Sequence, residues 1–272
     1  MGIDPPLALA SLSGEADADW ARAGSEHAGA AFLGGIALDA ESRDAVREMV
    51  ADRDRTEFLP ADPIAWIDRQ LAALADTPIR PAVNVRATGT APLRAAGEAC
   101  AGHDAILEVN AHCRQAELCG VGCGEALLSD TERLIEYVAA ASDADCDVSV
   151  KVRAEVDGVD LGRTARAVAD AGADAVHVDA MDSEGVVALA KDAAPELVVI
   201  ANNGVRDRAT VREYLAAGAD AVSVGRLSDD PRVLRRVRAA VDGWVAGDAS
   251  RPRETRESRE PREIRDTREV SR

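Results

Sequence analysis

Eight short apolar segments recur along the chain of 272 residues, and longer segments with a helical pattern separate them. The apolar segments are continuous and do not alternate in polarity, which is typical of parallel strands buried on both faces. This β/α alternation predicts an α/β fold, and the length fits a single (β/α)8 TIM barrel, which takes about 250 residues. The expected strands cover residues 7–12, 30–38, 79–85, 105–109, 148–152, 175–178, 197–201 and 221–224.

The helical segments carry their own start signals. A helix is predicted over 127–141, starting near Ser129, which faces Glu132 three residues on in a capping-box pattern. The long connection before the third strand is predicted to hold an extra helix around 64–74.

The end of the chain differs in composition from the rest. From Arg253 onward it repeats triplets that begin with Arg-Glu or Arg-Asp, and these contain too few apolar residues to build a core. We therefore expect the barrel to occupy residues 1–247 and residues 248–272 to form a disordered tail.

Acidic residues dominate the charge of the chain. It has 49 Asp and Glu residues against 32 Lys and Arg residues, a formal net charge of −17, and only two of the basic residues are lysines. Dense carboxylates of this kind are typical of halophilic proteins, because concentrated salt screens the repulsion between them. The sequence shows no basic cluster outside the tail, so its charge does not favour nucleic-acid binding.

The sequence carries no recognisable targeting or membrane-spanning signal. No apolar run approaches the roughly 20 residues that span a bilayer, and residues 1–6 lack the basic and apolar regions of a signal peptide. Five cysteines in a chain of this length do not indicate a disulfide framework. We expect a cytoplasmic protein with free thiols and no membrane partner.

Two loops after the last expected strands form a candidate phosphate site. Barrel enzymes place their active sites at the carboxyl ends of the strands, and the loops after strands seven and eight commonly bind phosphate. Here these loops contain Asn203-Gly204 and Gly225-Arg226, each shortly before a helix start. Small residues expose backbone N–H groups to an anion, and Arg226 adds a charged fork. The alternative is that the glycines only end the strands.

Lys151 lies in the middle of the expected fifth strand, in a chain that uses arginine almost everywhere else. A compact ammonium group at this position is suited to donate to the pyrimidine ring of a flavin and to stabilise its anionic reduced form. The alternative is a structural ion pair with Glu108.

The region around the fourth and fifth strands resembles the dihydrouridine synthase family, flavin-dependent enzymes that reduce uridine in transfer RNA. The family pattern is an asparagine, two further residues, the catalytic cysteine, a glycine-rich loop and a leucine pair before a helix. The chain is identified as a divergent, archaeal-type member of this family, and the likeness covers roughly residues 78–226. The matching residues are Asn110, Cys113, Gly122, Gly124, Leu127, Leu128, Lys151, Arg153, His177, Asn203, Gly204, Gly225 and Arg226.

The resemblance implies a cofactor, a reaction and a role for individual residues. FMN would be held by Lys151, His177 and the two phosphate loops, and Asn84 would stand where the family has a glutamine. Reduced FMN would pass a hydride to C6 of a uracil ring, and Cys113 would protonate C5 as a thiol kept protonated in an apolar site. Asn110 would orient the substrate. NAD(P)H is the expected electron donor, although no separate nucleotide-binding motif is visible.

The chain also departs from the family pattern. His112 replaces a glycine before the cysteine, and Arg114 replaces the proline after it. From the sequence we also expect no helical domain of the kind that grips transfer RNA. The resemblance therefore supports the flavin more strongly than the RNA substrate. A reductase or dehydrogenase of a free pyrimidine, similar to dihydroorotate or dihydropyrimidine dehydrogenase, and a non-catalytic barrel that binds a phosphate ligand remain as alternatives.

Three cysteines, Cys113, Cys119 and Cys123, follow the fourth strand closely. Together with His112 they offer ligands for zinc or an iron–sulfur cluster. Their C-x5-C-x3-C spacing lacks the tight C-x2-C pairs of such sites, so we expect no metal, one catalytic thiol and two small loop cysteines.

Overall fold

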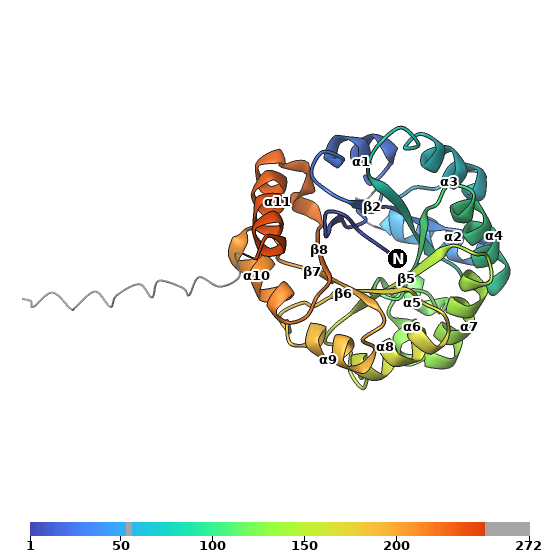
Figure 1. Ribbon diagram of the computed structural model, residues 1–272. Helices are drawn as coiled ribbons and strands as arrows, with labels where there is room; N and C mark the ends of the chain where they lie inside the picture. The colour runs from blue at the N-terminus through green and yellow to red at the C-terminus, as the bar shows by residue number, and fades with distance from the viewer. Residues whose placement is uncertain (53–55, 248–272) are drawn as a thin grey trace, which may run out of the picture.

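A computed structural model of the chain describes residues 1–52 and 56–247. Eight parallel strands run in sequence order around a closed barrel, and the last strand pairs with the first. Helices surround the barrel (Figure 1). The predicted (β/α)8 barrel is confirmed, whereas the expected disordered tail, 248–272, lies outside the described residues.

Each of the eight apolar segments forms one strand, and nearly every strand residue is buried. The strands are continuously apolar because they are buried on both faces, by side chains inside the barrel and by helices outside it. The strands are β1 (Leu7–Leu9), β2 (Ala30–Ala37), β3 (Arg80–Arg86), β4 (Ile106–Asn110), β5 (Asp147–Arg153), β6 (Ala175–Asp179), β7 (Val198–Asn202) and β8 (Ala221–Val224).

The helices confirm one prediction and correct another. An extra helix does precede β3, and Asp62 caps its start by accepting a hydrogen bond from Ala65 N at 3.0 Å. The helix expected over 127–141 is instead two helices, and Asp130, not Ser129, caps the second one. The helices are α1 (Ala18–Gly24), α2 (Ala40–Asp52), α3 (Pro63–Ala72), α4 (Thr90–Ala101), α5 (Ala116–Gly120), α6 (Ala126–Ser129), α7 (Thr131–Ser142), α8 (Leu161–Asp170), α9 (Val186–Ala193), α10 (Arg208–Ala216), the 3-10 helix η1 (Arg226–Asp229) and α11 (Pro231–Val245).

A shift of register between β2 and β3 shapes one side of the barrel mouth. The pairing of the two strands skips a residue between Gly34 and Ile36. A Cβ atom on the skipped residue, Gly35, would lie 2.6 Å from Asn84 Oδ1 and 3.2 Å from the guanidinium carbon of Arg86. The missing side chain therefore leaves room for the polar residues at the end of β3.

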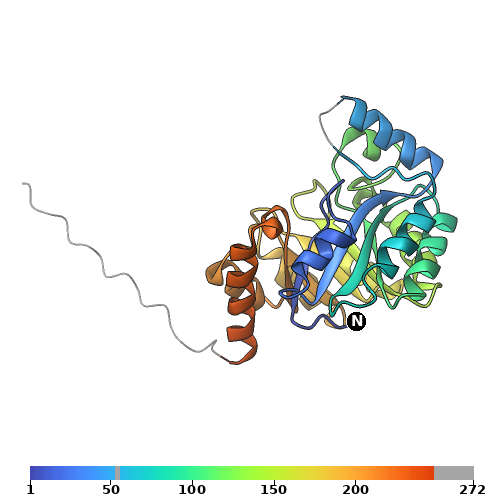
Figure 2. The same ribbon diagram turned by 90° about the horizontal axis from the view of Figure 1, so that it is seen from above.

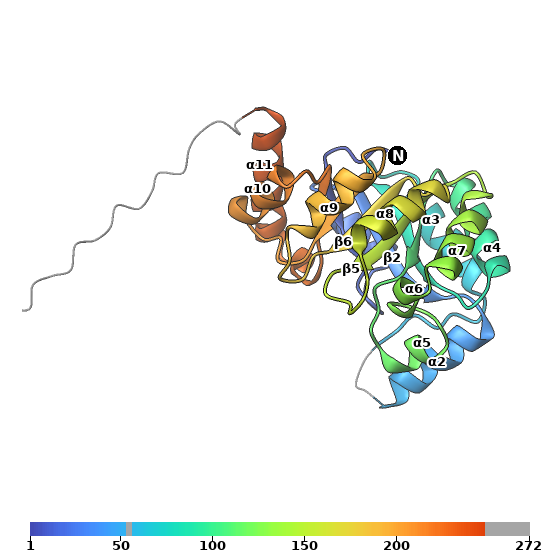
Figure 3. The ribbon, with the colours of Figure 1, turned by 90° about the horizontal axis from the view of Figure 1, so that it is seen from below.

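Helices α2 and α5 form a lobe beyond the carboxyl ends of the strands. They pack against each other and stand apart from the ring of helices around the barrel (Figures 2 and 3). A separate apolar cluster fills the lobe, and it reaches down to the loop after β4. Its buried members are Ala37, Ala45, Val46, Met49, Cys113, Leu118 and Cys123.

None of the helices in the described part of the chain is long and apolar enough to cross a bilayer.

Candidate active site

Glu108 is the centre of a polar network inside the barrel. Its carboxylate is fully buried and accepts hydrogen bonds from Asn84 Nδ2 at 2.8 Å, His177 Nδ1 at 2.7 Å and Ser149 Oγ at 3.2 Å. Burial alone would raise the pKa of Glu108, but the interaction with His177 and the bond from Asn84 lower it. Burial lowers the pKa of His177. The network therefore pairs the Glu108 carboxylate with an imidazole that donates from Nδ1.

The network continues to β7 and β8 through the other nitrogen of His177. His177 Nε2 lies 2.8 Å from Ser223 Oγ, which also accepts a bond from Asn202 Nδ2 at 2.8 Å. His177 is fully buried, and both ring nitrogens have protein partners. His177, which we expected to hold the cofactor, therefore makes contacts that keep Glu108 and Ser223 in place. Asn84 is equally buried and has the same kind of structural partners.

Asn110 connects this network to the loop that carries Cys113. Its Nδ2 donates to Asn84 Oδ1 at 2.8 Å, while its Oδ1 accepts from the backbone N–H groups of His112 and Cys113 at 3.1 and 3.0 Å. The glycine-rich loop closes over the other side, since a Cβ atom on Gly124 would lie 2.1 Å from the carbonyl oxygen of Cys113. Backbone and amide contacts therefore fix the position of the cysteine.

The Cys113 thiol has charged neighbours, and its surroundings are therefore more polar than the apolar site that the sequence led us to expect. The residue is 8% exposed. Burial would raise its pKa, but the Arg86 guanidinium, with further contributions from His112 and Asn110, brings the pKa of Cys113 to about 6. These neighbours therefore favour the thiolate form of the sulfur.

Arg86 was not foreseen as a site residue. It ends β3 with its side chain buried, where Nη1 donates to Glu57 Oε2 at 3.0 Å and Nη2 donates to Ser13 Oγ at 2.9 Å. Its buried Nε has no hydrogen-bond partner among residues 1–52 and 56–247. The signal was present in the sequence, because Arg86 follows Asn84 by two residues and side chains two apart on a strand share a face.

Asp179, at the end of β6, holds the imidazole of His112. The distance between His112 Nε2 and Asp179 Oδ2 is 2.6 Å, and Met181 N donates to the other carboxylate oxygen at 3.3 Å. Burial would lower the pKa of His112, but the bonds to Asp179 and Cys113 raise it. His112, which stands where the family has a glycine, is therefore held in position by Asp179.

Lys151 lies on the inner face of β5, one layer above Ser149. The residue is 4% exposed, and its ammonium group makes no hydrogen bond or ion pair with any described residue. The alternative of a direct ion pair with Glu108 is not what the structure shows, since Glu108 pairs with His177. Lys151 therefore retains its three donor hydrogens for a ligand.

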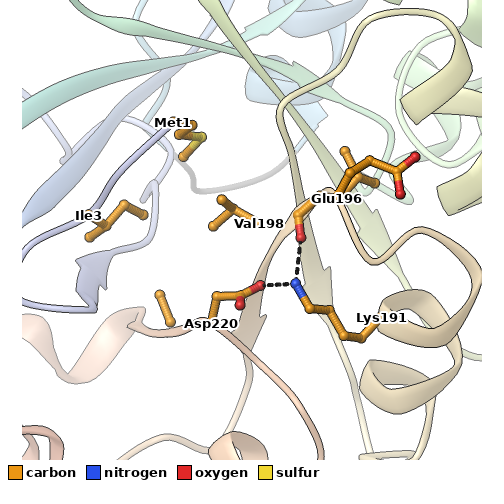
Figure 4. A pocket seen from close by; sticks show the side chains of 8 residues that line it. Met1, Ile3, Lys191, Glu196, Val198 and Asp220 are labelled. Atoms are coloured by element: carbon orange, nitrogen blue, oxygen red, sulfur yellow. Dashed lines mark hydrogen bonds and ion pairs between the residues drawn. The ribbon is translucent and has the colours of Figure 1, made fainter. Parts of the chain in front are cut away.

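The other lysine, Lys191, has a structural setting at the opposite end of the barrel. Its ammonium donates to the Leu197 carbonyl oxygen at 2.9 Å and to Asp220 Oδ2 at 2.7 Å (Figure 4). It borders a hollow of about 280 Å³ that Met1 and Ile3 also line. This hollow lies at the amino ends of β7 and β8, away from Cys113.

The predicted phosphate loops have an open backbone. Asn203 and Gly204 have positive φ angles of 91° and 66°, and Tyr214 Oη donates to the Asn203 carbonyl oxygen at 2.9 Å. In the part of the chain that the structure describes, the N–H groups of Gly204 and Val205 donate to no protein acceptor. No atom lies within 4 Å of a Cβ atom placed on Gly225. Free N–H donors and open space fit an anionic group.

The three loop cysteines do not converge. Cys119 Sγ lies 3.5 Å from the Cys113 carbonyl oxygen and Cys123 Sγ lies 3.3 Å from the Ala87 carbonyl oxygen. No group of three or more His, Cys, Asp or Glu residues that would suit a metal ion occurs within the described ranges.

The chain matches a known family over most of its length. The family model "Dihydrouridine synthase (Dus)" matches residues 36–254, which include the network, the cysteine loop and both candidate phosphate loops. A similar protein of Methanocaldococcus jannaschii, "Uncharacterized protein MJ0144", is 26% identical over 240 residues and aligns with 82% of this chain and 89% of its own length.

Solved structures show the same fold at low identity. DHODH from Eimeria tenella, in complex with ferulenol, superposes with a TM-score of 0.65 at 15% identity, over 89% of this chain and 82% of that one. A chain of the tryptophan synthase complex from Pyrococcus furiosus gives a TM-score of 0.53 at 14% identity, over 90% and 100%. At these identities the likeness concerns the barrel alone.

Proposed function

Because the chain belongs to the dihydrouridine synthase family, we propose that it reduces the C5–C6 double bond of uridine in transfer RNA with FMN as its flavin. One observation carries this proposal. The unpartnered Lys151, the open loops after β7 and β8, and a cysteine fixed by Asn110 all lie at the carboxyl end of one barrel.

The donors at this end fit the two chemical parts of FMN. The N–H groups of Gly204 and Val205, with the exposed Arg226, suit the phosphate. Lys151 suits the pyrimidine part of the ring, because a positive charge there stabilises the anionic reduced flavin. When bound, the flavin would supply the hydride, and NAD(P)H is the proposed source of its electrons. His177 and Asn84 act behind this site by keeping Glu108 and Asn110 in place.

The residues around Cys113 would deliver the proton. Asn110 holds the loop so that the sulfur stays in one position, and we propose that Cys113 hands a proton to C5 of the uracil ring. General acid catalysis of this kind contributes about 10²–10⁴-fold to a rate. Because the pKa of Cys113 is lowered, another group beside the sulfur is needed to hold the proton destined for C5.

An arginine-rich surface favours RNA over a free pyrimidine. The sequence suggested no basic cluster before the tail, whereas in the fold α10 and α11 lie side by side and bring dispersed arginines together (Figure 1). Residues 203–247 have eight basic and six acidic side chains, whereas residues 1–202 have 16 and 36. We define the arginine face as Arg206, Arg208, Arg212, Arg232, Arg235 and Arg236, which lie on or next to these two helices.

Several acidic residues near the arginine face are engaged in local structure. Asp207 and Asp230 cap α10 and α11, and Asp242 pairs with Arg238. A groove of about 170 Å³ between the helices is lined by arginines and by Trp244. Arginine beside an aromatic ring suits a nucleic-acid backbone and its bases. The face begins at the loop that contains Gly204, so a bound RNA would lie beside the barrel mouth.

The test has two separable parts. Protein purified in concentrated salt is expected to bind FMN and to lose the flavin absorbance when NAD(P)H is added without oxygen. Transfer RNA from a deletion strain is expected to lack dihydrouridine at one or more positions. Unchanged dihydrouridine, together with reduction of free uracil or orotate by the purified protein, would favour the free-pyrimidine alternative. Failure to bind FMN at any salt concentration would contradict the whole proposal.

A further inference from the structure

Cys113 and His112 are neighbours in sequence and in space. His112 is bound by Asp179, and Cys113 interacts with Arg86. His112 Nε2 lies 2.6 Å from Asp179, which leaves the other ring nitrogen, Nδ1, for the thiol beside it. The imidazole is 29% exposed, whereas Cys113 is 8% exposed. Protons from solvent therefore reach the imidazole more easily than the sulfur.

Arg86 stands beside the same sulfur with a permanent charge. Glu57 and Ser13 bind its two Nη atoms, so the guanidinium cannot swing away. Its Nε–H group is buried and has no hydrogen-bond partner among the described residues, and the guanidinium interacts electrostatically with Cys113. A buried donor without an acceptor is costly, and a sulfur anion would satisfy it.

We propose that Cys113 and His112 rest as a thiolate–imidazolium pair, and that His112 stores the proton which the reaction consumes. Arg86 and Asp179 position the pair by stabilising its negative and positive members. The pair is inferred from the anchoring of His112 by Asp179, from the buried and unsatisfied Nε of Arg86, and from the interactions of both residues with Cys113. Only its use in turnover rests on the proposed function.

The proposed proton route balances with the hydride transfer. Before reduction the proton moves from His112 Nδ1 to Cys113 Sγ, giving a neutral imidazole and a thiol. With a reduced flavin bound, C6 of the uracil ring would receive a hydride with its electron pair, the C5–C6 π bond would break, and C5 would take the proton from the sulfur. The uracil ring would be reduced at the expense of the flavin. The sulfur is again a thiolate, and His112 takes a new proton from solvent.

Some of the other charged and titratable groups around the pair raise the pKa values of its members, and others lower them. The charge of Lys151 opposes protonation of His112 and so lowers its pKa, against the stronger effects of Asp179 and Cys113. The groups that face the pair are Arg86 with Glu57 from the β3 side, Lys151 on β5, Asp179 and His177 on β6, and Cys119, Cys123 and Glu125 in the cysteine loop.

The thiolate can be measured directly in the flavin-free full chain by its absorbance at 240 nm. The other cysteines do not interfere near neutral pH. Burial raises the pKa values of Cys100 and Cys119 and brings those of Cys123 and Cys146 to about 12 and about 11. We expect one thiolate to appear as the pH rises through about 6. It should be absent in Cys113→Ala and unchanged in Cys119→Ser, the matched control.

Replacing Arg86 or His112 should raise the pH at the midpoint of this titration. In Arg86→Gln and in His112→Gln the midpoint should move toward about 8.5, the ordinary value for cysteine. Arg86→Lys, which keeps the charge, should shift it less and guards against a variant that does not fold. A wild-type midpoint near 8.5, or a midpoint that neither His112→Gln nor Arg86→Gln moves, would overturn the proposal.

Measurements of kcat and KM distinguish a His112 that stores the proton from a His112 that is only structural. His112→Ala should lower kcat by about 10²-fold with little change in KM for transfer RNA, and added imidazole should restore part of kcat. An effect on KM alone would overturn the role in turnover. If the thiolate titrates as expected but no pyrimidine is reduced, the proposed function fails while the ion pair stands.

Discussion

Lys151 and Lys191 carry the same side chain in opposite surroundings. The ammonium of Lys191 is bound by a carboxylate and a carbonyl oxygen, whereas that of Lys151 has neither within the described residues. The sequence singled out Lys151 by its place in the middle of the expected fifth strand. The contacts agree with that choice, because only Lys191 has structural partners among the described residues.

We predict that Lys151→Met weakens flavin binding by at least about tenfold, since one charge-assisted hydrogen bond contributes about 1.5–3 kcal/mol. The free energy of unfolding should change little, because Lys151 makes no bond in the described chain. Lys191→Met is the control and should show the reverse, normal flavin affinity and a lower melting temperature. Both quantities follow from flavin fluorescence titration and thermal unfolding. Equal flavin affinity in the two variants would contradict the assignment.

Gly124 permits the close approach of the glycine-rich loop to Cys113. Its φ angle is positive, and an added Cβ atom would meet the Cys113 carbonyl oxygen at 2.1 Å. We predict that Gly124→Ala displaces the cysteine and raises the midpoint of its titration at 240 nm. Gly120→Ala serves as control, because no atom lies within 4 Å of its added Cβ. A normal titration in Gly124→Ala would mean that the loop does not fix the sulfur.

At the scale of elements, strands were predictable because their apolar runs reflect burial on both faces. The positions of Asn110, Cys113 and Lys151 on one rim followed directly, since the carboxyl ends of all barrel strands meet there. The partnership of Arg86 with Cys113 was not predictable, because it depends on how the loop after β4 lies against the end of β3. The break at Asp130 was missed because two short helices joined there have the apolar period of a single helix.

The pairing of α10 with α11 is what turns dispersed arginines into a surface. We predict that Arg232→Gln with Arg235→Gln weakens binding of transfer RNA several-fold. The salt dependence of the affinity should fall by roughly one unit of slope for each phosphate that the variant no longer binds. Turnover of free uridine should not change. Arg163→Gln with Arg166→Gln on α8 is the control, and an equally weakened affinity in both double variants would assign the effect to net charge.

At the scale of the whole molecule, the charge is distributed unevenly. Residues 1–202 contain an excess of 20 acidic side chains, and this repulsion acts against the compact state. Salt shortens the Debye length from about 10 Å at 0.1 M to about 3 Å at 1 M. We therefore predict that the melting temperature rises by roughly 4–8 °C over this range of KCl, which corresponds to about 2 kcal/mol. A constant or falling melting temperature in calorimetry would contradict this interpretation of the composition.

The lobe of α2 and α5 shares its apolar core with the reactive cysteine. Met49 and Val46 on α2 belong to the same buried cluster as Cys113 and Cys123. We therefore expect a substitution that repacks α2 to shift the sulfur relative to Arg86. The titration of the cysteine would then report on how well a helix outside the barrel is packed.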